Sequence, residues 1–183
     1  MNLTHHFLVS MPIVTDDYFG QSVIYLVEHN QDGAWGVVAN KPVGLDLGEI
    51  FNQLDIPCDN ESRSKSAVLR GGPVDEQQGI VLHRPGPAFE ATKNYAGGVS
   101  MSSSKDVLEA LAAGNSPDDY RVFLGHAGWE AGQLESEIAD NAWLTDPACA
   151  DQLFDTAPMD LRTTVANSIG VDLNLLSTQT GNA

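Results

Sequence analysis

The chain has 183 residues, enough for one domain with a hydrophobic core, and its 25 acidic and 9 basic side chains give a formal net charge of −16. This charge disfavours direct binding to nucleic acids and to anionic membranes, because both depend on Lys and Arg meeting phosphates. The longest apolar run, 23–27, is far too short to span a bilayer. The N-terminus has no signal-peptide pattern, so we expect a cytoplasmic protein without membrane contact.

Runs of apolar and β-branched residues predict a series of strands. The clearest pair flanks the turn Asn30-Gln31-Asp32-Gly33, since Asp-Gly between two such runs is a strong hairpin signal. The predicted strands cover 7–13, 22–29, 34–40, 67–69, 79–83, 97–102 and 120–124.

Helical spacing and capping residues predict helices between and after these strands. Gly114 suits the end of one helix and Pro158 the first turn of another. The predicted helices cover 46–54, 105–113, 151–154 and 158–169, and a further one begins at Gln133. Strands and helices are interspersed without regular βαβ units, which favours an α+β fold with a mixed or closed small sheet over a doubly wound α/β fold. We expect a single domain over residues 1–183.

The stretch Arg70-Gly71-Gly72 is the first candidate site. Two glycines free the backbone to point N–H groups at one anion, and the Arg70 guanidinium could add a bidentate contact to a phosphate or carboxylate. The stretch lacks a complete phosphate-binding motif. Its structural alternative is a glycine turn between two strands.

Histidines supply the second hypothesis. His83 ends one predicted strand and His126 follows another, so the two imidazoles could meet at one end of the sheet and act as acid and base or hold a metal. Hydrogen-bonded structural histidines are the alternative. No zinc-type spacing and no activated Ser or Cys is found, so no metal site and no cofactor is predicted. Cys58 and Cys149 are expected to be free thiols.

The glycine-rich stretch 124–143 is the third candidate. Three glycines, Gly125, Gly128 and Gly132, predict a tight corner between a strand and the helix that begins at Gln133. Acidic side chains near the start of that helix favour the helix and repel an anionic ligand. We therefore interpret the stretch as a structural corner.

Three blocks of the sequence resemble one known family. They are QSVIYLVEHNQDGAWGVVANKP at 21–42, RGGPVDEQQGIVLH at 70–83, and GHAGWEAGQLESEIADNAWL at 125–144. With Leu153-Phe154-Asp155-Thr156 and the terminal Gly181-Asn182-Ala183, they look like the AlgH/YqgE family of bacterial proteins. The resemblance implies a small β-barrel-like sheet with helices around it, in a cytosolic protein. It brings the label of transcriptional regulator, but no established reaction or ligand.

Together these observations favour a regulatory or binding protein over an enzyme, since no complete catalytic constellation is found. The expected partner is a protein or a small anionic ligand, and direct contact with nucleic acid is disfavoured by charge. The alternative is an enzyme or metabolite-binding protein. Its ligand-binding residues would be Arg70, Gly71, Gly72 and His83.

Overall fold

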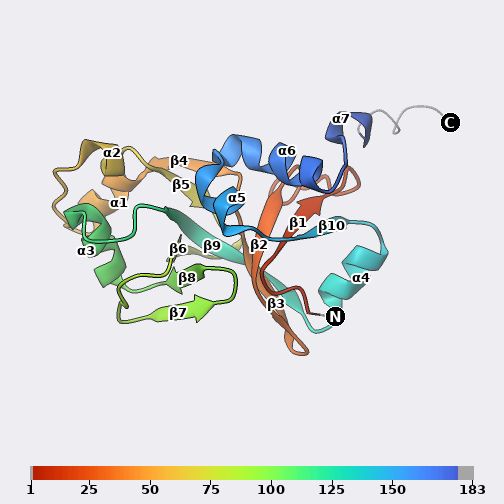
Figure 1. Ribbon diagram of the computed structural model, residues 1–183, viewed down its shortest axis with the longest axis horizontal. Helices are drawn as coiled ribbons and strands as arrows, with labels where there is room; N and C mark the ends of the chain where they lie inside the picture. The colour runs from red at the N-terminus through yellow and green to blue at the C-terminus, as the bar shows by residue number, and fades with distance from the viewer. Residues whose placement is uncertain (1, 177–183) are drawn as a thin grey trace.

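Across residues 2–176, which the computed structural model describes, ten strands form one mixed sheet held together by the long strand β9 (Figure 1). The terminal Gly181-Asn182-Ala183 of the family resemblance lies outside the described residues. The strands are β1 (His6–Ser10), β2 (Val23–Asn30), β3 (Gly33–Val38), β4 (Pro42–Asp46), β5 (Ala67–Arg70), β6 (Val74–His83), β7 (Thr92–Tyr95), β8 (Val99–Ser102), β9 (Tyr120–Glu130) and β10 (Trp143–Pro147).

The sheet runs in the order β10-β1-β2-β3-β9-β6-β8-β7, and β5 adds to β9 as its one parallel neighbour while β4 pairs with β5. The path curls into a half-barrel that ends at β10 and β7. The predicted α+β class with a barrel-like mixed sheet is confirmed.

Helices cover the two ends and one side of this sheet. In Figure 1, α1, α2 and α3 gather at one end, α4 lies at the other, and α5 and α6 lie along the upper side. No helix within the described part of the chain is long and apolar enough to cross a membrane. The helices are α1 (Leu47–Gln53), α2 (Glu61–Ser64), α3 (Lys105–Ala113), α4 (Gln133–Ala139), α5 (Ala150–Asp155), α6 (Pro158–Ser168) and α7 (Leu173–Leu176).

The β2–β3 hairpin confirms the prediction from its turn residues. Asn30 pairs with Gly33, which leaves a two-residue turn between the strands. Most of β2 is buried, including the fully covered Tyr25 and Val27, because α5 and α6 pack on one face of the sheet and α4 on the other.

The stretch after Leu124 corrects the predicted corner. Residues 125–130 continue β9: His126 pairs with Val74 of β6, and 127–130 pair with β3, with Trp129 opposite Ala34. The chain turns only at Gly132, which has a left-handed φ of 77° and leads into α4. Sequence patterns missed this extension because the glycines weaken the strand signal, whereas the hydrogen bonds to β3 stabilise it.

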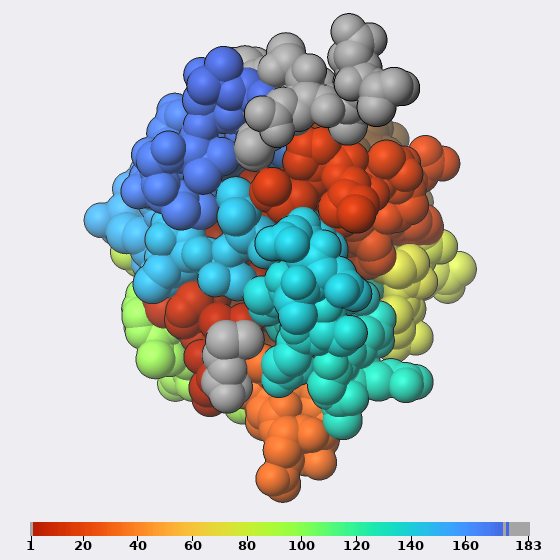
Figure 2. Space-filling view, turned by 90° about the vertical axis from the view of Figure 1, so that its right-hand side faces the viewer, coloured from red at the N-terminus to blue at the C-terminus, as the bar shows by residue number. Residues whose placement is uncertain are grey.

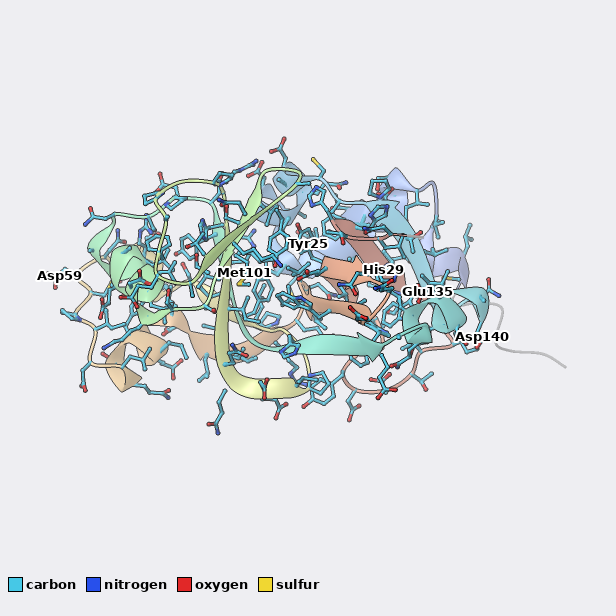
Figure 3. The ribbon with its side chains drawn as sticks, turned by 90° about the horizontal axis from the view of Figure 1, so that it is seen from below. Tyr25, His29, Asp59, Met101, Glu135 and Asp140 are labelled. Atoms are coloured by element: carbon cyan, nitrogen blue, oxygen red, sulfur yellow. The ribbon has the colours of Figure 1, made fainter. Side chains whose placement is uncertain are left out.

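Helix α4 is fastened to the sheet by hydrogen bonds. The Glu137 carboxylate accepts hydrogen bonds from the indole N–H groups of Trp129, at 2.9 Å, and Trp143, at 2.7 Å. Figure 3 shows His29 beside Glu135, where the His29 Nε2 lies 3.0 Å from the carboxylate. The acidic face of α4 thus serves the fold.

Two glycine-rich stretches cross at β9. β5 lies on one edge of β9 and β6 on the other, and Gly71 and Gly72 carry the chain across the β9 backbone. A Cβ on Gly71 would lie 2.0 Å from the Gly125 carbonyl oxygen, and one on Gly72 would lie 2.2 Å from the His126 carbonyl carbon. Only glycine permits this approach of backbone to backbone.

Candidate functional site: a cationic groove

A groove of about 1180 Å³ lies between the N-terminal loop 11–21 and helix α6. Its floor includes Asn40, Lys41 and Arg70, at the junction of β3, β4 and β5. Figure 2 shows the red N-terminal segment and the blue C-terminal helices at the same end of the molecule. We name this feature the cationic groove, after Lys41, Arg70 and Arg162.

Lys41 and Arg70 are neighbours through backbone pairing. The Arg70 backbone N–H donates to the Lys41 carbonyl oxygen at 2.7 Å. The Lys41 ammonium donates to the carbonyl oxygens of Asp17, at 3.1 Å, and Tyr18, at 2.9 Å, which holds the loop against the floor. The Arg70 guanidinium lies over the Tyr18 ring, 5.3 Å from its centroid.

Arg162 reaches the groove from α6. Leu161 and Val165 on this helix are buried in the core, while Met159, Arg162 and Thr163 line the groove. The Arg162 guanidinium donates to the Ser10 carbonyl oxygen at 2.9 Å, but its buried Nε–H has no partner within the described part of the chain. A buried donor without an acceptor is unfavourable, so this group would gain from an anion.

The cations of the groove differ from most others among the described residues in that they form no ion pair with a carboxylate. Five of the nine cationic side chains have a carboxylate partner, namely Arg63, Lys65, Arg84, Lys93 and Lys105. Arg121 instead donates to three backbone carbonyl groups. The three that remain are those of the cationic groove. They share the lining of the groove with three carboxylates, those of Asp16, Asp17 and Asp172.

The charges within the groove are unevenly distributed. Burial is the main cause that lowers the pKa of Lys41, and Arg70 and Arg162 lower it further, while Asp16 and Asp17 counteract them. Burial also lowers the pKa of Arg162. The Asp16 carboxylate already accepts two backbone N–H groups of its own loop. The guanidinium groups of Arg70 and Arg162 thus line the groove without an ion pair to a carboxylate of the described residues.

Gly71 and Gly72 do not add a cradle to this groove. The Gly71 N–H donates to the Leu124 carbonyl oxygen at 2.8 Å, and the Gly71 carbonyl accepts from Val38 at 2.8 Å. Neither glycine lines the groove. Of the predicted stretch, only Arg70 belongs to the candidate site; the glycines serve the crossing over β9.

His83 lies away from Arg70. It pairs with Tyr120 at the start of β9, whereas Arg70 pairs with Leu124 across the opposite edge, about 13 Å further along the strand. The imidazole is 1% exposed, with Nδ1 2.7 Å from the Arg84 carbonyl oxygen and Nε2 2.9 Å from the Ser102 hydroxyl. Desolvation by burial lowers its pKa, although the hydrogen bond to Arg84 opposes this. These contacts are those of a structural histidine.

The proposed meeting of His83 and His126 does not occur. His126 lies six positions beyond the partner of His83 on β9, roughly 20 Å along the strand. Its ring packs edge-on against Trp35, with centroids 5.9 Å apart. The thiols of Cys58 and Cys149 are free, as expected.

Sequence reasoning missed Lys41 and Arg162. Lys41 lies next to the end of the block 21–42, which contributes to the family resemblance, but no anion-binding motif surrounds it. Arg162 could have been noticed as the one basic residue on a helix with a buried face. Neither signal indicates proximity to Arg70, because that depends on the β4–β5 pairing and on the packing of α6.

Comparison with known proteins gives a consistent family assignment. The AlgH-like family pattern matches residues 7–174. The chain is 47% identical to the AlgH protein of Pseudomonas aeruginosa over 182 residues, which cover 99% of this chain and 96% of that one. A protein of Chromobacterium violaceum is 42% identical over 184 residues, covering 100% and 98%.

Two solved structures have the same fold as this chain. The solution structure of Pseudomonas aeruginosa AlgH aligns with a TM-score of 0.82 at 46% identity, covering 100% of this chain and 97% of that one. A crystal structure from Corynebacterium diphtheriae aligns with a TM-score of 0.74 at 24% identity, over 96% and 92% of the two chains, and shows the shared fold alone. The chain therefore belongs to the AlgH family, whose function is uncharacterised.

Proposed function

We propose that this protein is a cytoplasmic regulatory or binding protein that takes a small phosphate- or carboxylate-bearing ligand in the cationic groove. The observation that carries the proposal is that Lys41, Arg70 and Arg162 line one groove and that none of them forms an ion pair with a carboxylate of the described residues, in a strongly acidic chain. Guanidinium groups in a partly dry site bind oxyanions through charge-assisted hydrogen bonds.

The chain's overall charge favours a small ligand over a large anionic partner. Nucleic acids and acidic proteins are repelled by the whole negative surface, because their many charges interact with it at long range. A small anion carries few charges and interacts chiefly with the groove. A direct contact with DNA is thus the weaker form of a regulatory role.

The test is titration of the full chain with inorganic phosphate and pyrophosphate, at constant ionic strength, by calorimetry and thermal unfolding. We expect a ligand-dependent rise in the unfolding temperature that chloride does not produce. Removing one guanidinium by Arg70→Met or Arg162→Met should weaken binding about tenfold or more, as expected for a charge-assisted hydrogen bond.

The matched control is Lys105→Met, which removes an exposed cation outside the groove that faces Glu109 at 3.6 Å. It should leave phosphate binding unchanged. Equal weakening by the control would show a nonspecific charge effect and contradict the proposal. So would tighter, salt-sensitive binding of a random DNA duplex.

A further inference from the structure

Apolar surface adjoins the cationic part of the groove. Met11, Pro12, Val14, Met159 and Leu173 line it together with the charged residues. Met159 is 74% exposed, and Ile13, in the turn between Pro12 and Val14, is 69% exposed. Exposed apolar side chains that gather at a concave polar site are typical of ligand-binding surfaces.

Helix α6 places one apolar and one cationic side chain next to each other. Met159 and Arg162 are three positions apart, so they occupy the same face of the helix in successive turns. Both line the groove, as does Asn167 further along the helix. The groove therefore follows α6 for about 12 Å. An anion held by Arg162 would have its neighbouring atoms beside Met159.

The size of the groove exceeds what an inorganic anion fills. Its volume of about 1180 Å³ is slightly larger than that of typical sites for small organic ligands, which span roughly 300–1,000 Å³. Only the region between Arg70 and Arg162 is suited to the anionic group. The apolar residues that line the groove beside this region favour an apolar occupant.

We infer that the ligand of the cationic groove is amphiphilic: a phosphate or carboxylate joined to an apolar chain of several carbon atoms. This inference rests on the proposed function and specifies its ligand class. The anionic group binds between Arg70 and Arg162, and the chain lies along Met159 and Val14. The net charge of −16 argues against an acidic protein segment as the occupant, since long-range repulsion grows with the partner's charge.

The experiment is calorimetric titration of the full chain with alkyl phosphates from methyl to hexyl, at fixed pH and ionic strength. The charge stays constant along the series while the apolar area grows. Affinity should rise with length, by up to about fourfold for each methylene that becomes fully buried, and hexyl phosphate should bind at least about tenfold more tightly than methyl phosphate. Hexanoate against hexyl phosphate then distinguishes the two anionic groups.

Two variants separate the parts of the site. Met159→Ser should flatten the dependence on chain length, so that hexyl phosphate loses most of its advantage over methyl phosphate; the side chain is 74% exposed, so the substitution does not disturb the core. Arg70→Met should weaken the whole series in parallel. Leu54 follows the last residue of α1, is 38% exposed and lies outside the groove, so Leu54→Ser is the matched apolar control. It should change neither the dependence on chain length nor the affinity for the series.

The outcomes distinguish this inference from the proposed function. Binding of phosphates without any dependence on chain length would overturn the amphiphilic ligand and leave the anion site standing. A dependence that persists in Met159→Ser but disappears in Leu54→Ser would place the chain elsewhere and also overturn it. Failure of every phosphate and of hexanoate to bind would refute the anion site itself.

Discussion

The two edges of β9 carry two polar side chains of opposite character. Arg70, at the end of β5, keeps its guanidinium over the Tyr18 ring and has no ion pair within the described residues. His83, at the end of β6, is 1% exposed and has both ring nitrogens hydrogen-bonded. Both residues end strands, so position in a strand does not separate them. What separates them is whether the fold already satisfies the polar group.

The largest effect on stability is expected at the crossing of Gly71 and Gly72 over β9. Gly71→Ala would place a Cβ 2.0 Å from the Gly125 carbonyl oxygen, where rigid backbone cannot yield. We expect a loss of about 3 kcal/mol in the free energy of unfolding, at the upper end of overpacking effects, or failure to fold. Urea unfolding followed by tryptophan fluorescence measures it.

Gly128→Ala is the control for this variant. It adds the same methyl group to β9, where nothing lies within 4 Å and no left-handed φ is required. Its stability should stay within about 1 kcal/mol of the parent chain. Similar unfolding free energies for the two variants would show that the crossing is looser than its contacts indicate.

The next largest effect is expected at His83, where the free energy of unfolding should depend on pH. Burial lowers the pKa of His83 in the folded chain below its ordinary value of 6.5. Below pH 6.5 the unfolded chain therefore binds more protons at this residue than the folded chain does. The stabilisation is therefore complete above that value and is lost as pH falls toward the folded-state pKa. His83→Gln keeps hydrogen-bonding capacity without titration and should reduce the slope of stability between pH 7.5 and 5.

His5 contributes a remaining slope of the same sign, since burial and then His6 lower its pKa. His83 lies outside the groove, so the phosphate affinity of His83→Gln at pH 7.5 should equal that of the parent chain. An unchanged pH slope would show that His83 is not the titrating group. Weakened phosphate binding would show that the two edges of β9 are coupled.

The smallest effect is expected at Tyr18, whose ring contacts the Arg70 guanidinium. The Tyr18 hydroxyl donates to Glu76, while its ring lies under Arg70. Tyr18→Phe keeps the ring and should change phosphate affinity by less than about twofold, whereas Tyr18→Ala should weaken it about two- to fivefold through loss of the cation–π contact. Equal effects of the two variants in calorimetry would assign the role to the hydroxyl instead.

Much of the fold was accessible from local patterns, and less of the candidate site. The hairpin at Asn30–Gly33, the helix ended by Gly114 and the helix opened by Pro158 each follow from a few adjacent residues. The continuation of β9 through residues 125–130 did not, because its strand character comes from pairing with β6 at His126 and with β3 at 127–130. Arg70 was predicted as an anion contact; Lys41 and Arg162 were not.

By itself, the sequence determined the net charge of −16, the hairpin, the helix boundaries set by Gly and Pro, and the family resemblance, since each depends on composition or on neighbouring residues. Only the tertiary structure decided that Gly71 and Gly72 serve a backbone crossing and that His83 is buried away from Arg70. It also decided which cations lack a carboxylate partner. The physical reason is that ion pairing and burial depend on distances between segments remote in the chain, which no local pattern contains.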